Sequence, residues 1–97
     1  MSLFDGTQIT IPEAVLHQQL GAETVLLHLS TEHYYGLDEV GSRVWQLLHE
    51  HDTVDPIVAA LVREYEVDET TLRGDLERLL GRLAETGLIH VERGPKG

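Results

Sequence analysis

The chain has 97 residues, of which 41% are hydrophobic and 25% are charged, as expected for one globular domain with a single modest core. Seventeen carboxylates against seven Lys and Arg residues give a formal net charge of −10, and such a surface repels phosphate backbones and attracts basic segments. The absence of cysteine excludes disulfides, thiol nucleophiles and thiolate metal sites.

The first elements in chain order are three predicted strands, residues 14–20, 24–30 and 32–37. Each is a short run rich in apolar or aromatic residues, and GAE between the first two predicts a hairpin turn. The third run, EHYYGL, follows the second closely enough to pair with it. The three strands are therefore expected to form an antiparallel meander.

Three helices follow, because from Asp38 onward the apolar residues recur at helical rather than alternating spacing. Asp38 and Asp68 are predicted N-caps of the first and third helices. Asp55 before Pro56 predicts the N-cap and first residue of the second helix. The expected buried stripes of the first two helices are Val44, Trp45, Leu47 and Leu48, and then Ile57, Val58, Leu61, Val62 and Tyr65.

The third helix is the longest, and Gly87 is expected to end it in the left-handed conformation, with Leu88 packed against Leu83. Residues 88–92 predict a short final strand, and residues 92–97 are expected to be a frayed tail. The predicted core stripe of this helix is Leu72, Leu76, Leu79 and Leu83, with Leu80 on its flank.

This order predicts an α+β, winged helix-turn-helix-like fold, with a three-stranded antiparallel sheet followed by three helices. One domain is expected over residues 1–97, with its core in residues 14–91. No apolar run approaches the roughly 20 residues of a membrane span, and the first ten residues lack the basic and apolar regions of a signal peptide. We therefore expect a cytoplasmic protein with no membrane partner.

No sequence motif indicates catalysis, a cofactor or a metal site. The chain has no Gly-rich phosphate loop, no glycine-framed serine and no H-E-x-x-H pattern. His49 and His51 are two residues apart, so on a helix they point in different directions, and their position at a helix end explains them. We therefore expect neither an enzyme nor a bound cofactor or metal.

A DNA-binding role is an alternative that the fold suggests, since the third helix would be the recognition helix. This helix carries Arg73, Arg78 and Arg82, but its first turn begins with Asp68, and residues 1–42 hold six carboxylates and no Lys or Arg. Each carboxylate that faces a phosphate opposes the counterion release that supplies most non-specific affinity. We expect no nucleic-acid partner, with a winged-helix regulator kept as an alternative.

The third strand lies at an edge of the predicted sheet and lacks the Lys or Pro that commonly guards an edge. Tyr35 shares the core-facing side with His33 and Leu37, while Tyr34 lies on the other side with Gly36. Such an edge accepts an extended peptide as a fourth strand. The alternative is that both tyrosines belong to the core and that a loop covers the edge.

Two segments, YYGLDEVGSRVWQLL and TVDPIVAALVREYEVDETTLRGDLERLLGRLAETGLI, resemble the PqqD-like family, also called RiPP recognition elements. The family pattern combines an aromatic strand, a capped first helix with Gly and Trp, a Thr-Val start and aromatic end to the second helix, Asp-Leu in the third and a terminal Gly-Leu. The resemblance spans residues 14–91, and Asp38 stands where the family more often has Asn. The matching positions are Tyr35, Leu37, Asp38, Gly41, Val44, Trp45, Leu47, Leu48, Thr53, Val54, Ile57, Tyr65, Asp75, Leu76, Gly87 and Leu88.

The resemblance implies that the chain binds the leader segment of a ribosomally made precursor peptide by β-strand addition and delivers it to a modifying enzyme. The chain is most like the leader-binding subunit of a split lasso-peptide B protein. Its implied partners are the leader peptide, a separate cysteine-protease subunit and, as a further candidate, a cyclase. The alternative within the family is the peptide chaperone of pyrroloquinoline quinone synthesis, which presents its peptide to a radical enzyme.

Carried over by position, the resemblance also implies the contact residues. The leader is expected to pair with Glu32, His33, Tyr34, Tyr35 and Gly36. The implied pocket wall on the third helix is Leu72, Asp75, Leu76, Leu79 and Arg82. Leu80 and Ala84 are the alternates, because the sequence leaves open which flank of the helix faces the edge. Trp45 and Leu48 are expected in the core.

Overall fold

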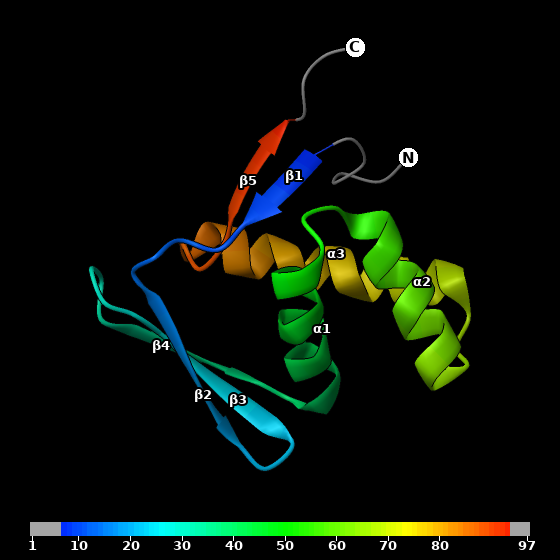
Figure 1. Ribbon diagram of the computed structural model, residues 1–97, viewed down its shortest axis with the longest axis horizontal. Helices are drawn as coiled ribbons and strands as arrows, with labels where there is room; N and C mark the ends of the chain where they lie inside the picture. The colour runs from blue at the N-terminus through cyan, green and yellow to red at the C-terminus, as the bar shows by residue number, and fades with distance from the viewer. Residues whose placement is uncertain (1–6, 94–97) are drawn as a thin grey trace.

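The computed structural model describes residues 7–93. Its strands and helices follow one another in the predicted order, with one additional strand at the start (Figure 1). The elements are β1 Thr7–Thr10, β2 Val15–Leu20, β3 Glu23–His28, β4 His33–Leu37, α1 Glu39–Glu50, α2 Val54–Tyr65, α3 Glu69–Glu85 and β5 His90–Arg93.

The predicted three-stranded meander is confirmed, as an antiparallel sheet of order β2-β3-β4. Gly21, with φ +67°, supplies the left-handed conformation in the turn between β2 and β3. The turn between β3 and β4 closes with the Glu32 N–H donating to the His28 carbonyl at 2.7 Å. Glu32 itself has φ 60°, so the third strand begins at His33 rather than at the predicted residue 32.

The two faces of this sheet differ in burial. The face toward α1 contains Leu26, which is fully buried, and its register partners His17 and Tyr35. The outer face has no helix packed on it among the described residues (Figure 1). That outer face carries the exposed apolar side chains Leu16, Leu20, Leu29 and Tyr34.

A second sheet of two strands, β1 and β5, lies across the C-terminal end of α3 (Figure 1). The final strand was predicted over residues 88–92 but begins at His90, because Leu88 and Ile89 form the turn that leaves the helix. β1 was not predicted, and it is held by its pairing with β5 and by the Ile9 N–H, which donates to the Asp52 carbonyl at 2.7 Å. Residues 92–93 belong to β5 rather than to a frayed tail, and residues 94–97 lie outside the described part.

Two of the three predicted N-caps are confirmed. Asp38 accepts a hydrogen bond from the Gly41 N–H at 2.8 Å, and Asp68 caps α3 by accepting from Thr71. The prediction for α2 was wrong, because the helix begins at Val54, after Thr53. Val54 is buried, which favours winding the helix two residues earlier, and Pro56 remains tolerated because it sits within the first turn.

The core lies between α1, the inner face of the sheet, α2 and one side of α3. Trp45 and Leu48 are buried in it as predicted. The α3 stripe is rotated from the prediction, because Leu80 is fully buried and Leu79 only half-buried. Arg73, which is seven residues before Leu80 and so lies on the same side, pairs with Asp55 of α2 at 3.0 Å. Packing against α2 therefore buries this flank of α3.

The end of α3 is a Schellman motif, as predicted. Gly87 has φ +78°, the Leu88 N–H donates to the Leu83 carbonyl at 2.8 Å, and the Gly87 N–H donates to the Ala84 carbonyl at 3.1 Å. Leu88 is fully buried. The turn therefore satisfies two terminal carbonyls of the helix and places an apolar residue in the core.

Replacing Gly87 by Ala is expected to lower the free energy of unfolding by about 1–3 kcal/mol, because a residue with a Cβ is strained at positive φ. The matched control is Gly81→Ala within α3, where an added Cβ meets no atom within 4 Å. That control should be neutral or stabilising by up to about 1 kcal/mol. Urea unfolding of both variants measures the difference, and equal losses would contradict the assigned role of Gly87.

Candidate functional site

The backbone of β4 is open along one side. The Leu29 N–H donates to the Ala14 carbonyl at 2.8 Å, so alternate residues of β3 bond toward β2 and those between them bond toward β4. The β3 residues that bond toward β4 are paired with His33, Tyr35 and Leu37. Tyr34 and Gly36 therefore direct their N–H and C=O groups toward the free edge of the sheet. Within residues 7–93, no strand pairs with that edge.

The two tyrosines of β4 lie on opposite faces, as the alternation predicts. Tyr34 is 73% exposed on the outer face, opposite Leu27. Tyr35 is half-buried on the helix-facing side and packs against the core. Tyr34 also lines a shallow cavity of about 350 Å³ together with Leu27, Leu29 and Glu32. Tyr35 thus contributes to folding, and Tyr34 presents its ring beside the open edge.

The two ends of helix α3 lie near the two ends of β4, in the opposite order. At its C-terminal end, a Cβ added at Gly87 would lie 3.6 Å from the ring of His28, which pairs with the first residue of β4. At its N-terminal end, Leu72 and Asp75 line a pocket with Val40, which lies in the first turn after β4. The strand edge and the helix therefore bound the same side of the molecule.

The pocket at the N-terminal end of α3 is small and mainly apolar, with a volume of about 160 Å³. Both the buried Leu72 and the exposed Asp75 line it. The Asp75 carboxylate is paired with Arg78. The lining residues are Val40, Tyr65, Val67, Thr71, Leu72 and Asp75.

The predicted α3 residues are only partly brought together. Leu72 and Asp75 line the pocket, whereas Leu76 is buried in the core. Leu79 is half-buried and Arg82 is exposed, on the flank of α3 that carries Asp75. Of the two alternates, Leu80 is fully buried and Ala84 half-buried. The opposite flank faces α2, since Arg73 bonds Asp55 there.

Sequence reasoning missed four of the pocket residues: Val40, Tyr65, Val67 and Thr71. Val40 and Val67 are exposed apolar side chains, each within two residues of a helix cap. An apolar residue just before an N-cap, such as Val67, commonly packs against the fourth residue of its helix, whereas the approach of Val40 to this pocket depends on the tertiary arrangement. Tyr65 was assigned wholly to a buried stripe, and the structure leaves it half-buried.

Most arginines of the helices are held by carboxylates of the same chain. Arg43 forms two hydrogen bonds to Glu64, at 2.9 and 2.7 Å, which raises the pKa of Arg43 and lowers the pKa of the Glu64 carboxyl. Arg73 bonds Glu69 and Asp55, each at 3.0 Å, and these bonds raise its pKa. Positive charge on α3 is therefore largely compensated locally.

Two further features of the described residues bear on the site. Among residues 7–93, no group of three or more His, Cys, Asp or Glu side chains is arranged to hold a metal ion. In the same part of the chain, no helix has the length and apolar character required to cross a membrane.

The comparisons with known proteins agree with this geometry. The solved structure of TbiB1 in complex with the TbiA(beta) leader peptide is similar to this chain, with a TM-score of 0.79 and 44% sequence identity over 84% of this chain and 94% of that one. No curated protein matches the chain. The family model of coenzyme PQQ synthesis protein D (PqqD) matches residues 23–89, which include β3, β4 and all three helices. With more than half of its length matched by that model, the chain belongs to the PqqD family.

Proposed function

We propose that this protein binds the leader segment of a ribosomally made precursor peptide as a fourth strand on β4. It then delivers the peptide to a leader peptidase or modifying enzyme of lasso-peptide biosynthesis, in the cytoplasm where the peptide is made. The observation that carries the proposal is the 44% identity to a protein solved with its leader peptide bound. The open edge of β4 provides the unpaired backbone N–H and C=O groups that a leader strand requires.

The affinity of such a complex would come mainly from the backbone. Tyr34 and Gly36 offer outward N–H and C=O groups, and a paired leader strand satisfies them without displacing any strand of the sheet. Side chains on one face of the leader would then point toward α3. The pocket formed by Val40, Leu72 and Asp75 accepts one apolar side chain of modest size.

Electrostatics favours a basic leader. The chain carries a net charge of −10, and Glu32 and Asp75 lie at the two ends of the proposed surface. Opposite charge on the leader speeds encounter more than it strengthens the final complex. The proposed contact residues are therefore Glu32, His33, Tyr34, Tyr35 and Gly36 on the strand side, with Leu72, Asp75, Leu76, Leu79 and Arg82 along the helix.

The partners that receive the peptide belong to the same proposal. The chain carries no catalytic motif, so removal of the leader falls to a separate cysteine-protease subunit, with a cyclase as the next enzyme. A role as chaperone of pyrroloquinoline quinone synthesis is the second candidate, because the matching family model describes a protein of that synthesis. Both functions use the same strand edge and differ in the peptide that binds.

The test of the proposed function is a calorimetric titration of the protein with the leader segments of precursor peptides encoded beside its gene. We expect saturable binding in the micromolar range or tighter, which corresponds to about 8 kcal/mol or more. Random duplex DNA at the same ionic strength is the control. Salt-sensitive binding to the duplex without binding to any leader would instead establish a DNA-binding role.

Replacing Gly36 by Pro is expected to weaken leader binding by about tenfold or more, because it removes an outward N–H and leaves its acceptor on the leader unpaired. The matched control is Gly36→Ala, which keeps the N–H and adds a Cβ with no atom within 4 Å. Calorimetry of both variants gives the two affinities. Leader binding by Gly36→Pro at wild-type affinity would rule out strand addition at this edge.

Tyr34 and Tyr35 are expected to respond differently to truncation. Tyr34→Ala removes a side chain that is 73% exposed, so it should weaken leader binding with little change in melting temperature. Tyr35→Ala removes a ring packed against the core and should lower the free energy of unfolding by about 2 kcal/mol. Thermal unfolding and calorimetry on the same samples measure both effects, and an equal loss of stability in the two variants would refute this division.

A further inference from the structure

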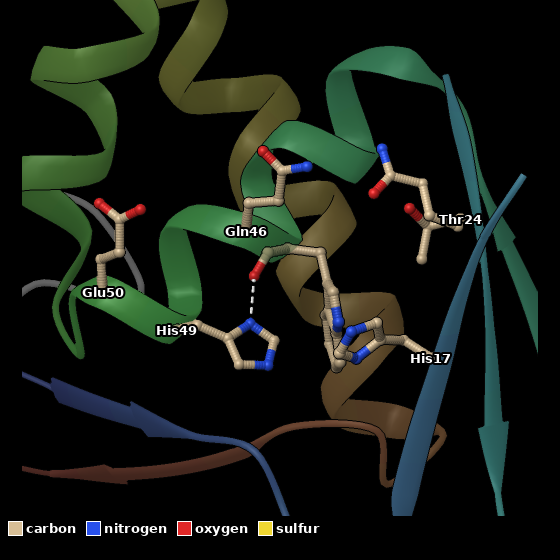
Figure 2. A pocket seen from close by; sticks show the side chains of 7 residues that line it. His17, Thr24, Gln46, His49 and Glu50 are labelled. Carbon is tan, nitrogen blue, oxygen red and sulfur yellow. Dashed lines mark hydrogen bonds between the residues drawn. The ribbon is translucent and has the colours of Figure 1, made fainter. Parts of the chain in front are cut away.

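Two cavities beside the main sheet differ in the charge that they present. The cavity between β2 and α1 has a volume of about 260 Å³, and the Glu50 carboxylate at this cavity points away from the rings of His17 and His49 (Figure 2). The outer cavity, on the outer face beside β4, has a volume of about 350 Å³. Its lining residues are Leu27, Leu29, Glu32 and Tyr34. The outer cavity thus joins apolar walls to one acidic group.

The apolar walls of the outer cavity are open to solvent. Leu27 and Tyr34 are register partners on β3 and β4, and Leu29 directly follows β3. Leu29 is 51% exposed and Tyr34 is 73% exposed. Apolar side chains that are grouped and this exposed mark a contact surface. The ring of Tyr34 also offers a face that attracts a cation.

The Glu32 carboxylate at this cavity has no hydrogen-bond or ion-pair partner within residues 7–93. By contrast, Arg43, Arg73 and Arg78 are each held by carboxylates of the helices. Residues 1–42, which include all three strands of the main sheet, contain no Lys or Arg. No cation of this sheet is available to Glu32, so its carboxylate is open to a cation from another molecule.

The backbone of Glu32 is held in a strained conformation. Its φ is 60°, a left-handed value that costs less for glycine than for a residue with a Cβ. The Glu32 N–H donates to the His28 carbonyl at 2.7 Å, and the Ser30 N–H donates to Nδ1 of His28 at 3.2 Å. A glycine at position 32 would relieve the strain but would remove the carboxylate from the cavity. Backbone strain of this kind is concentrated at functional sites, which points to a use for the Glu32 side chain.

A leader strand on β4 would carry side chains past this cavity. Neighbouring strands lie about 4.8 Å apart, and residues directly opposite one another point to the same face of a sheet. The leader residue opposite Tyr34 therefore presents its side chain on the outer face. Only a long side chain spans the distance from the leader strand across the Tyr34 ring to the Glu32 carboxylate.

Lys and Arg match both kinds of wall. Their aliphatic stems pack on apolar surface while the charged head makes polar contacts, which fits Leu29 and Tyr34 beside Glu32. An acidic side chain would meet a like charge there. A neutral apolar side chain would contact the walls but would cover Glu32 without giving it a partner.

We propose that the outer cavity selects one Lys or Arg side chain of the leader, whose charged head pairs with the Glu32 carboxylate. This site acts only on a leader that is paired with β4, and so it rests on the proposed function. The leader is then recognised on both of its faces, with apolar side chains toward α3 and one basic side chain on the outer face. A leader that lacks this cation binds more weakly, even when its apolar side chains are unchanged.

The test uses the leader peptides encoded beside the gene, with each Lys and Arg replaced singly by norleucine, which keeps an aliphatic stem and removes the charge. Calorimetry at low ionic strength measures their affinities for the wild-type protein. We expect one replacement to weaken binding by about fivefold, and the others to have smaller effects. Equally small effects at every position, or binding of a leader that contains no Lys or Arg, would overturn the proposal.

Glu32→Gln provides the matched variant, because it removes the charge and keeps the length of the side chain. It should bind the unmodified leader about fivefold more weakly, and it should bind the sensitive norleucine peptide as well as the wild type does. The control is Glu23→Gln, at the exposed start of β3 on the same face, which should leave the affinity nearly unchanged. Equal losses in the two variants would assign the effect to net charge instead of to this cavity.

The wild-type protein separates the failure of this site from the failure of strand addition. If it binds the leader and Glu32→Gln binds equally well, the outer cavity selects no side chain, while strand addition on β4 stands. If it binds no leader, both are overturned. Added salt should shrink the difference between the wild type and Glu32→Gln, because it screens an exposed ion pair, whereas the loss caused by Gly36→Pro should persist.

Discussion

The core of this protein can cover only one face of its main sheet, since a domain of 97 residues has volume for a single core. Leu26 at the centre of β3 and Trp45 on α1 are both buried in the core that joins the sheet to the helices. Packing on this side leaves the outer face and both strand edges uncovered within the described residues. The proposed leader site lies where this one-sided core ends, at the edge formed by β4.

The junction between β4 and α1 determines how the open edge is presented. Asp38 ends the strand, caps the helix and accepts from the Gly41 N–H. A Cβ at position 41 would lie 3.2 Å from the Asp38 carboxylate and 3.3 Å from the Leu37 side chain, so a larger residue would require these side chains to shift by a few tenths of an ångström. Gly41 therefore leaves room for the Asp38 cap and the Leu37 side chain, and Val40 beside it lines the pocket on α3.

Local signals in the sequence account for most of the fold and for part of the site. Alternation identified β4 and the opposite faces of its tyrosines, and the caps at Asp38, Asp68 and Gly87 bounded two helices. The start of α2 at Val54 was missed because Asp55–Pro56 is the stronger local signal, whereas burial of Val54 is a tertiary effect.

The rotation of α3 was also missed, and it decides which of its side chains face the edge. Helical spacing alone makes Leu79 and Leu80 nearly equivalent, and packing against α2 selects Leu80 for the core. β1 was not predicted because its four residues form a strand only by pairing with β5, which is distant in the sequence. The approach of β2 to α1 was not predicted either, because no local pattern in the sequence indicates a contact between His17 and Trp45.

The net negative charge of the chain also opposes self-association. Edge strands without Lys or Pro are prone to pair with copies of themselves, and both edges of this sheet are open within the described residues. Each copy carries a charge of −10, so two molecules repel as their edges approach, over a distance of about 10 Å at 0.1 M ionic strength. Like charge thus opposes edge-to-edge pairing of two copies in dilute salt, while a segment of opposite sign meets no such barrier at the same edge.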